Sequence, residues 1–272
     1  MPEGDTIFRT ASTLRRWIGG REVTAATGPA GIDRAIGATV TEVEPRGKHL
    51  LIRFSSKVVL HTHMRMSGSW HVYPAGERWR RARSQARVVL ACGDRVAVCF
   101  NAPVVQVLAD HEERIHPALT RLGPDVLTNH FDLEEVLRRA GGSPLRTLIG
   151  ELLLDQTIVA GFGNIYRCEA LFLRGLDPWT PLEELDAADL GQLIVTGRRL
   201  ISHNAGPGSP VAREFGVGRD GPWVYGRTGR PCRRCGTSIR SDRLGEQARM
   251  AHWCPRCQKR PQRAQIGHSR AD

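Results

Sequence analysis

The chain has 272 residues, 40% of them hydrophobic and 25% charged, which is the composition of an ordinary globular protein long enough for two domains. Its formal net charge of +11 and sequence pI near 10.1 are unusual, and they indicate an anionic partner, with nucleic acid as the first candidate. No run approaches about eighteen apolar residues, so no membrane span is expected. The N-terminus lacks a basic segment followed by an apolar one, so no signal peptide is expected either.

The N-terminal residues predict a helix. Their apolar positions repeat at helical spacing: Ile7, Ala11, Leu14 and Ile18. Asp5 or Thr6 can cap its start, and Gly19-Gly20 ends it. Taken alone, Pro2-Glu3 is a lead-in to this helix, with an acid at the positive end of the helix dipole.

From about residue 21 to residue 110 the hydrophobic pattern changes to period two. Five short runs predict strands: Thr39–Val43, His49–Phe54, Lys57–His61, Gln85–Leu90 and Asp94–Phe100. Many short strands joined by tight turns favour an antiparallel sandwich or barrel. Basic residues lie at the turns, notably Arg46 and Lys48, and the stretch Arg78–Arg87 holds five arginines.

The second half of the chain predicts helices. The helical segments are Asp132–Ala140, Leu145–Asp155, a helix that starts at Asn164, and Asp186–His203. Asn164 follows two glycines in a compact turn, so it is a candidate phosphate contact at a helix N-terminus, or an ordinary N-cap. His203–Trp223 is rich in Gly and Pro and predicts a long mobile loop, and the polar tail after Pro261 predicts disorder.

Four cysteines form two close pairs near the C-terminus. Cys232 and Cys235 are separated by eighteen residues from Cys254 and Cys257, a spacing typical of a structural Zn²⁺ site with no open coordination position. Two disulfides or free buried thiols are the alternatives. The three remaining cysteines do not form a disulfide framework, which fits a reducing cytoplasm.

The positive charge is concentrated around these cysteines. Arg227–Arg263 contains eleven Arg and Lys against two acids, a net +9 out of +11 for the chain. A hairpin with this charge is suited to bind phosphates, and a solvated basic face is the alternative.

Several of these motifs together resemble the formamidopyrimidine-DNA glycosylase and endonuclease VIII family, over residues 2 to about 258. The matching stretches are Met1-Pro2-Glu3-Gly4, Gly47-Lys48, Gln156–Glu169 and Val224-Tyr225-Gly226-Arg227 leading into the cysteines. The resemblance implies an α+β fold with DNA between two domains. Its parts would be an N-terminal antiparallel β-sandwich with a flanking helix (1–115), a helical domain with a helix-two-turn-helix (116–222), a zinc-finger β-hairpin (223–260) and a disordered tail (261–272).

The resemblance also implies catalytic roles. After removal of Met1, the Pro2 amine would attack the sugar C1′, because an α-amino group titrates near about 8 and is partly neutral at physiological pH. Glu3 would shuttle protons on the sugar side. Lys48 would contact the phosphate or the damaged nucleoside, and Arg249 would clamp a phosphate during a second elimination.

Further residues would bind DNA. Asn164 would be a phosphate ligand, and Arg121 in Arg-Leu-Gly-Pro-Asp would be another DNA contact. Met66 would fill the gap left by the extruded base, although a buried position at the end of a strand is the alternative for this residue.

Two departures from the family pattern affect the expected substrate. Members commonly carry a second glutamate shortly after Glu3, where this chain has Asp5-Thr6. Formamidopyrimidine-type members have an Arg and a Phe in a later loop, which is matched here by Asn101–Gln106. The second departure favours the endonuclease VIII branch, whose members prefer oxidised pyrimidines. Within that branch the chain resembles the actinobacterial second subgroup.

The predicted function is therefore a DNA repair glycosylase with abasic-site lyase activity, acting through a Pro2 Schiff base and β/δ-elimination. The alternative is a non-catalytic or lyase-only zinc-ribbon DNA-binding protein of the same fold. We expect a monomer that binds damaged DNA and one structural Zn²⁺, located in the cytoplasm and associated with the nucleoid.

Overall fold

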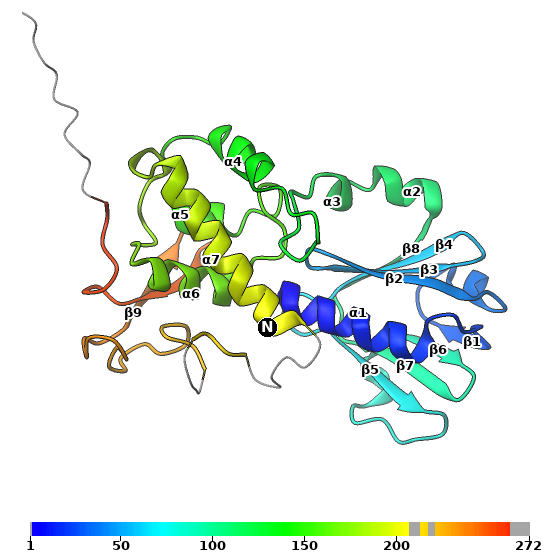
Figure 1. Ribbon diagram of the computed structural model, residues 1–272. Coiled ribbons are helices and arrows are strands. Elements are labelled where there is room, and N and C mark those ends of the chain that lie inside the picture. The colour runs from blue at the N-terminus through cyan, green and yellow to red at the C-terminus, as the bar shows by residue number, and fades with distance from the viewer. Residues whose placement is uncertain (1, 207–212, 217–220, 262–272) are drawn as a thin grey trace, which may run out of the picture. The chain divides into compact units, whose positions relative to one another are not determined.

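The computed structural model describes residues 2–206, 213–216 and 221–261 (Figure 1). The chain divides into two compact units, which are described separately. The sandwich unit consists of the described residues of 1–131, 159–162 and 201–209, and the helical unit consists of those of 132–158, 163–200 and 210–272. The domain boundaries expected from the sequence remain a prediction, and the tail 262–272 lies outside the described residues.

The first part of the chain forms two antiparallel sheets and a long helix. Its elements are α1 (Gly4–Ile18), β1 (Ala25–Thr27), η1 (Ile32–Ala35), β2 (Val40–Arg46), β3 (His49–Phe54), β4 (Val58–His63), β5 (Ser69–Pro74), η2 (Arg83–Gln85), β6 (Ala86–Cys92), β7 (Arg95–Phe100), β8 (Val104–Ala109), α2 (Asp110–Ile115) and α3 (Pro117–Thr120). The sheet orders are β1-β6-β7-β5 and β2-β3-β4-β8. Figure 1 shows α1 alongside both sheets. The antiparallel sandwich predicted from the sequence is therefore confirmed.

Helix α1 buries the face that the sequence predicted. Its four apolar positions are at most 1% exposed and pack in one core with side chains from both sheets. Burying a Leu or Ile side chain contributes roughly 1.5–3 kcal/mol, so this face holds the helix in place. The expected cap at Asp5 or Thr6 is wrong, because α1 already begins at Gly4 with Glu3 as its N-cap residue.

The five predicted strands are β2, β3, β4, β6 and β7, with ends that differ by at most three residues. The sequence pattern missed β1, which is only three residues long, and also β5 and β8. In β5 the alternation is hidden because both faces carry an aromatic residue: Trp70 packs against the core, and Tyr73 packs with Trp79 on the opposite face. The expectation of a loop over Asn101–Gln106 is wrong from Val104 onward, where β8 begins and pairs with β4.

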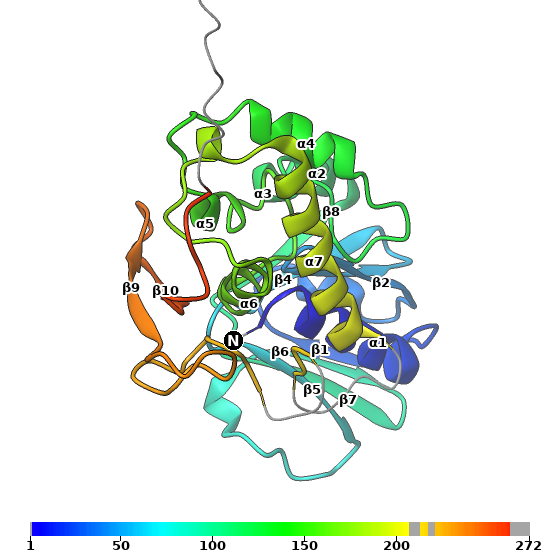
Figure 2. The same ribbon diagram turned by 60° about the vertical axis from the view of Figure 1, so that its left-hand side comes forward.

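The rest of the chain is mainly helical, and its β-hairpin lies next to α6 (Figure 2). The elements are α4 (Leu133–Gly141), α5 (Ile149–Leu152), α6 (Asn164–Arg174), η3 (Leu182–Glu184), α7 (Ala187–Ala205), β9 (Arg240–Leu244) and β10 (Arg249–Trp253). The predicted helices at 132–140, 164 and 186–203 are confirmed within two residues. No helix among the described residues is both long and apolar enough to cross a membrane.

The helix predicted over Leu145–Asp155 is reduced to the single turn of α5. The preceding residues pair with η3 instead: Glu183 N donates to Leu145 O at 3.0 Å, and Leu182 N donates to Thr147 O at 2.8 Å. Tertiary pairing therefore overrides the local helical pattern here. The predicted mobile loop 203–223 falls partly on residues 207–212 and 217–220, which lie outside the described residues.

Candidate active site and metal centre

The start of α1 fits closely against the segment 159–162. Gly4 N donates to Gly161 O at 3.0 Å, and a Cβ atom at position 4 would lie 2.9 Å from that oxygen. Gly161 has φ +101°, a conformation that glycine adopts without steric cost. Both glycines are therefore needed for the approach. It places Glu3, which is fully buried, and Pro2, which is half-buried, directly beside Gly161.

The turn between β2 and β3 packs against the same segment. A Cβ atom at Gly47 would lie 3.1 Å from the Ala160 Cβ atom, and Gly47 N donates to the Asp125 carboxylate at 2.6 Å. Lys48 follows Gly47 in this turn and is half-buried. Pro2, Glu3 and Lys48 are thus brought to one end of the sandwich unit, although the last is more than forty residues away along the sequence.

Asp125 is a residue that the sequence reasoning missed as part of this site. Its two carboxylate oxygens accept hydrogen bonds from Gly47 N and Leu127 N, at 2.6 and 2.9 Å. Burial raises the pKa of Asp125, and the two backbone donors oppose that rise. The signal was available in the Arg-Leu-Gly-Pro-Asp stretch, which was noted only for Arg121. Arg121 itself is exposed at the end of α3.

Three histidines line β3 and β4 next to the Lys48 turn: His49 and His61 are buried, and His63 is half-buried. The His49 ring is 5.0 Å from the His61 ring and 4.6 Å from the His63 ring, centroid to centroid. Burial, followed by the charges of Lys48 and Arg65, lowers the pKa of His63 to about 4, and burial lowers the pKa of His49 to about 2. Both imidazoles are therefore neutral at physiological pH, and they add no positive charge beside Lys48. The sequence analysis assigned these histidines no role.

Met66 projects from the turn between β4 and β5. It is 58% exposed, whereas Met64, two residues earlier, is 1% exposed and belongs to the core. The turn is held by Ser67 Oγ, which donates to Asn101 O at 3.1 Å, and by Gly68, whose Cβ atom would clash with the Met64 backbone. The alternative that Met66 is a core residue at the end of a strand is therefore wrong.

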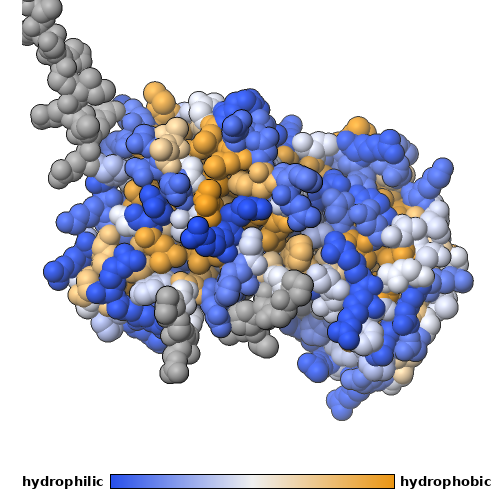
Figure 3. Space-filling view, viewed as in Figure 1, coloured by the Kyte–Doolittle hydropathy of each residue, from blue (hydrophilic) through white to orange (hydrophobic). Residues whose placement is uncertain are grey.

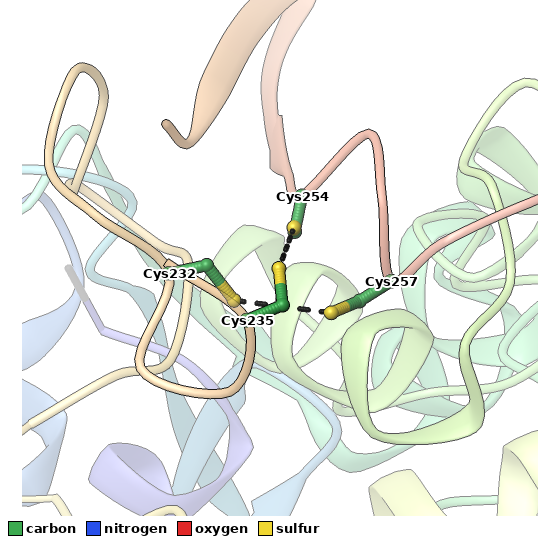
Figure 4. A group of neighbouring side chains, drawn as sticks. All are labelled: Cys232, Cys235, Cys254 and Cys257. Carbon is green, nitrogen blue, oxygen red and sulfur yellow. Dashed lines mark hydrogen bonds between the residues drawn. The ribbon is translucent and has the colours of Figure 1, made fainter. Parts of the chain in front are cut away.

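The four cysteines come together in the helical unit (Figure 4). Cys232 Sγ lies 3.9 Å from Cys257 Sγ, and Cys235 Sγ lies 3.5 Å from Cys254 Sγ. All four are free, so the disulfide alternative is wrong. A tetrahedral zinc with Zn–S bonds of about 2.3 Å separates its sulfurs by about 3.8 Å. The four thiols therefore fit a tetrahedral metal ion.

The hairpin β9–β10 is fastened to α6 by two buried polar side chains. Asn164 Nδ2 donates to Met250 O at 2.9 Å, and Arg167 Nη2 donates to the same oxygen at 3.0 Å. Arg249, the first residue of β10, lies next to this anchor and is half-buried. The alternative that Asn164 is an ordinary N-cap is wrong, because Gly163 is the N-cap residue of α6. The Asn164 Oδ1 atom is buried and has no hydrogen-bond partner among the described residues.

Glu169 fastens the segment that leads into the first cysteine pair. Its carboxylate accepts hydrogen bonds from the backbone of Trp223 at 2.6 Å, Val224 at 3.0 Å and Tyr225 at 2.9 Å. Glu169 is completely buried, and burial raises its pKa to about 7 against the opposing effect of these donors. Asn164, Arg167 and Glu169 therefore join one helix to both sides of the metal centre.

Comparison with known proteins extends over almost the whole chain. Residues 1–103 match the model of the formamidopyrimidine-DNA glycosylase N-terminal domain, and residues 122–204 match that of the formamidopyrimidine-DNA glycosylase H2TH domain. The chain is 41% identical to the probable endonuclease 8 2 of Streptomyces coelicolor, covering 96% of this chain and 95% of the relative. It is 36% identical to the DNA-(apurinic or apyrimidinic site) lyase Nei2 of Mycolicibacterium smegmatis, covering 95% and 99%.

The fold is also that of solved structures. A complex between wild-type Lactococcus lactis Fpg (MutM) and DNA containing N7-benzyl-Fapy-dG superimposes with a TM-score of 0.80. The sequence identity is 21%, and the match covers 95% of this chain and all of the other. At this identity the likeness establishes the architecture alone.

Proposed function

Because the chain belongs to the formamidopyrimidine-DNA glycosylase and endonuclease VIII family, we propose that it is a DNA repair glycosylase with abasic-site lyase activity. The observation that carries this proposal is the packing of the Pro2-Glu3 end and of the Lys48 turn against the same Ala160-Gly161 segment. A secondary amine, a buried carboxyl and an ammonium group at one end of the sandwich unit are the groups that imine chemistry on a sugar requires.

The reaction begins with the Pro2 amine once Met1 is removed. The nitrogen bonds to C1′ as the C1′–base bond breaks, and the base leaves with the bonding electrons and is protonated. Ring opening gives an iminium ion, which acts as an electron sink. Loss of a proton from C2′ then expels the 3′ phosphate. Glu3 carries protons on the sugar side, and Lys48 contacts the phosphate or the damaged nucleoside and assists elimination.

The helical unit supplies phosphate contacts under the same proposal. Asn164 and Arg249 lie at the junction of α6 and β10, and Arg249 assists the second elimination. Met66 fills the gap left by the extruded base, because an exposed methionine at a turn can offset part of the lost stacking. Arg121 is a further DNA contact on the exposed end of α3.

The metal is one Zn²⁺ held by Cys232, Cys235, Cys254 and Cys257. Four cysteine sulfurs at distances that fit a tetrahedral ion, in two C-x2-C pairs, are typical of a structural zinc site. The ion supplies structure and no chemistry, because four protein ligands leave no position for a substrate. We also propose that the protein acts as a monomer, and its cytoplasmic, nucleoid-associated location remains a prediction.

A lyase without base excision is a second candidate. Asp5 and Thr6 stand where family members carry a second glutamate. Thr6 Oγ1 donates to Asp5 Oδ1 at 3.3 Å, and the buried Asp5 carboxylate lies 3.6 Å from the Arg9 guanidinium. This arrangement offers a weaker proton relay than two glutamates do. Such a protein would cleave abasic DNA and release no damaged base.

Borohydride trapping on abasic DNA tests the proposal. The full chain is made with an N-terminal extension that a protease removes to leave Pro2 first, and cleaved and uncleaved proteins are compared. We expect covalent trapping at Pro2 only in the cleaved protein, since only it has a free secondary amine. Lyase activity in protein that retains Met1, as shown by mass spectrometry, would sink the assignment of the nucleophile.

A further inference from the structure

A second basic surface lies in the sandwich unit, in the connection between β5 and β6. We define the arginine loop as residues 75–87, which include η2 and the first two residues of β6. Its five arginines are Arg78, Arg80, Arg81, Arg83 and Arg87. All five arginines are exposed, and Glu77 is the only acid within residues 75–87. None of the five arginines forms an ion pair with a carboxylate in the described part of the chain. In Figure 3 hydrophilic side chains cover the lower edge of this unit, where the loop lies in Figure 1.

The arginine loop is anchored by an aromatic cluster. The Trp79 ring stacks on Tyr73 at 6.3 Å and meets Phe100 edge to face at 5.8 Å, both measured between ring centroids. Arg80 N donates to the Tyr73 hydroxyl at 3.2 Å, and the Arg83 guanidinium carbon lies 4.9 Å from the Trp79 ring centroid. Because the backbone is already held, a ligand that binds these arginines pays less entropy for ordering the loop.

The end of the arginine loop is connected to the turn that carries Met66. Asn101 N donates to Gln85 O at 2.9 Å, and Asn101 O accepts from Ser67 Oγ at 3.1 Å. The loop, the 101–103 turn and the Met66 turn therefore form one continuous edge of the sandwich unit. If Met66 inserts into DNA, as the proposed function requires, the phosphate backbone flanking the insertion passes beside this edge.

We propose that the arginine loop binds the phosphate backbone of the DNA, as a second phosphate-binding surface separate from the β9–β10 hairpin. This inference rests on the proposed function. Guanidinium groups match phosphate oxygens in pairs, and clustered charges without partner acids gain the most from an anion. The stretch Asn101–Gln106 lacks the Arg and Phe of formamidopyrimidine-type members, so this stretch offers no guanidinium of its own to DNA.

The test compares two charge-matched double variants of the full chain. Arg80→Gln with Arg81→Gln removes two side chains of the arginine loop and leaves the Arg80 N–H in place. Arg16→Gln with Arg34→Gln is the control. Arg16 lies roughly 18 Å along α1 from the first residue of that helix, which is next to Pro2 and Glu3. Arg34 lies in η1, before the start of β2, whereas Lys48 follows the end of β2. A third variant, Arg80→Lys with Arg81→Lys, keeps the charge and checks that the fold tolerates substitution.

Dissociation constants for an abasic-analogue duplex are measured over a salt series. The glutamine loop variant should bind roughly tenfold more weakly, and its log–log salt slope should fall by about two, since each lost phosphate contact removes about 0.9. The lysine variant should keep most of the slope, and the control should match the unmodified protein. Equal affinity and slope for the loop variant and its control would overturn the proposal.

Neutral methylphosphonates at single positions of either strand locate the contact. At one or two positions a methylphosphonate should weaken DNA binding by the unmodified protein but not by the Arg80/Arg81 glutamine variant. At the same positions it should still weaken DNA binding by an Arg249→Ala variant. Undiminished sensitivity of the loop variant at every position would also overturn the proposal. Borohydride trapping and single-turnover cleavage with saturating enzyme are measured on the unmodified protein, so a failure of the proposed function is seen separately from a failure of the loop to bind DNA.

Discussion

A comparison of Arg249 with Arg240 tests whether Arg249 has a specific role in DNA binding or contributes only to the general positive charge of the hairpin. They lie at opposite ends of the same hairpin, where Arg249 pairs with Leu244 and Arg240 pairs with Trp253. Arg249 is half-buried next to the Asn164 anchor, whereas Arg240 is exposed. We expect Arg249→Ala to keep zinc and fold, to lower the salt slope of DNA binding by about one, and to slow the second elimination.

Arg240→Ala is the matched control for this prediction. Denaturing gels of abasic-strand cleavage resolve the products of the first and second eliminations, and binding is followed over the same salt series. If both replacements cause equal and small losses, Arg249 has no assigned role, and the hairpin is only a diffuse basic surface.

Glu169 predicts a pH dependence of stability. Its pKa is raised from 4.5 to about 7 by burial, so between these values the folded protein holds a proton that the unfolded chain releases. The free energy of unfolding should therefore fall as the pH rises from about 4.5 to about 7, by up to about 3 kcal/mol. Urea unfolding of the unmodified chain and of Glu169→Gln should differ in this slope. Parallel stability curves would contradict the prediction, and the metal site, common to both proteins, cancels in the comparison.

Among the elements, the β9–β10 hairpin should depend for its order on the metal that we propose for the four cysteines. Cys254→Ser, or chelation, removes the closed set of four ligands, so β9 and β10 should lose their order and DNA affinity should fall. The two sheets and α1 share no ligand with the metal and should keep their circular dichroism. Metal analysis should give one zinc per chain in the unmodified protein and in Cys92→Ser, a buried cysteine outside the set. A variant without metal that binds DNA normally would contradict this prediction.

At the scale of the whole molecule, the substrate is predicted to be an oxidised pyrimidine. The Arg and Phe that replace a flipped base in formamidopyrimidine-type members are absent from Asn101–Gln106, and half of that stretch is strand β8. Side-by-side excision rates should therefore be higher for oxidised pyrimidines than for 8-oxoguanine paired with cytosine. A preference for duplex 8-oxoguanine would refute the branch assignment. Cleavage of abasic sites without excision of any base would support the lyase-only candidate.

Features that depend on near neighbours along the chain could be predicted from the sequence alone. The buried face of α1, five of the strands and the starting residue of α6 follow from hydrophobic periodicity, which local geometry imposes. The cluster of four cysteines that could hold a metal follows from two close pairs, since the C-x2-C spacing is typical of metal ligands. The roles of Pro2, Glu3 and Lys48 came from the family resemblance and not from these local patterns.

Contacts between residues far apart in the sequence become visible only once the elements are packed. Asp125 holds the Gly47 turn from seventy-eight residues away, and Glu169 holds the backbone at Trp223 from fifty-four residues away. No periodicity encodes such pairs, because each depends on how separate elements pack. For the same reason the sequence left Met66 open between core and surface, whereas the packing of Met64 and Gly68 leaves Met66 exposed.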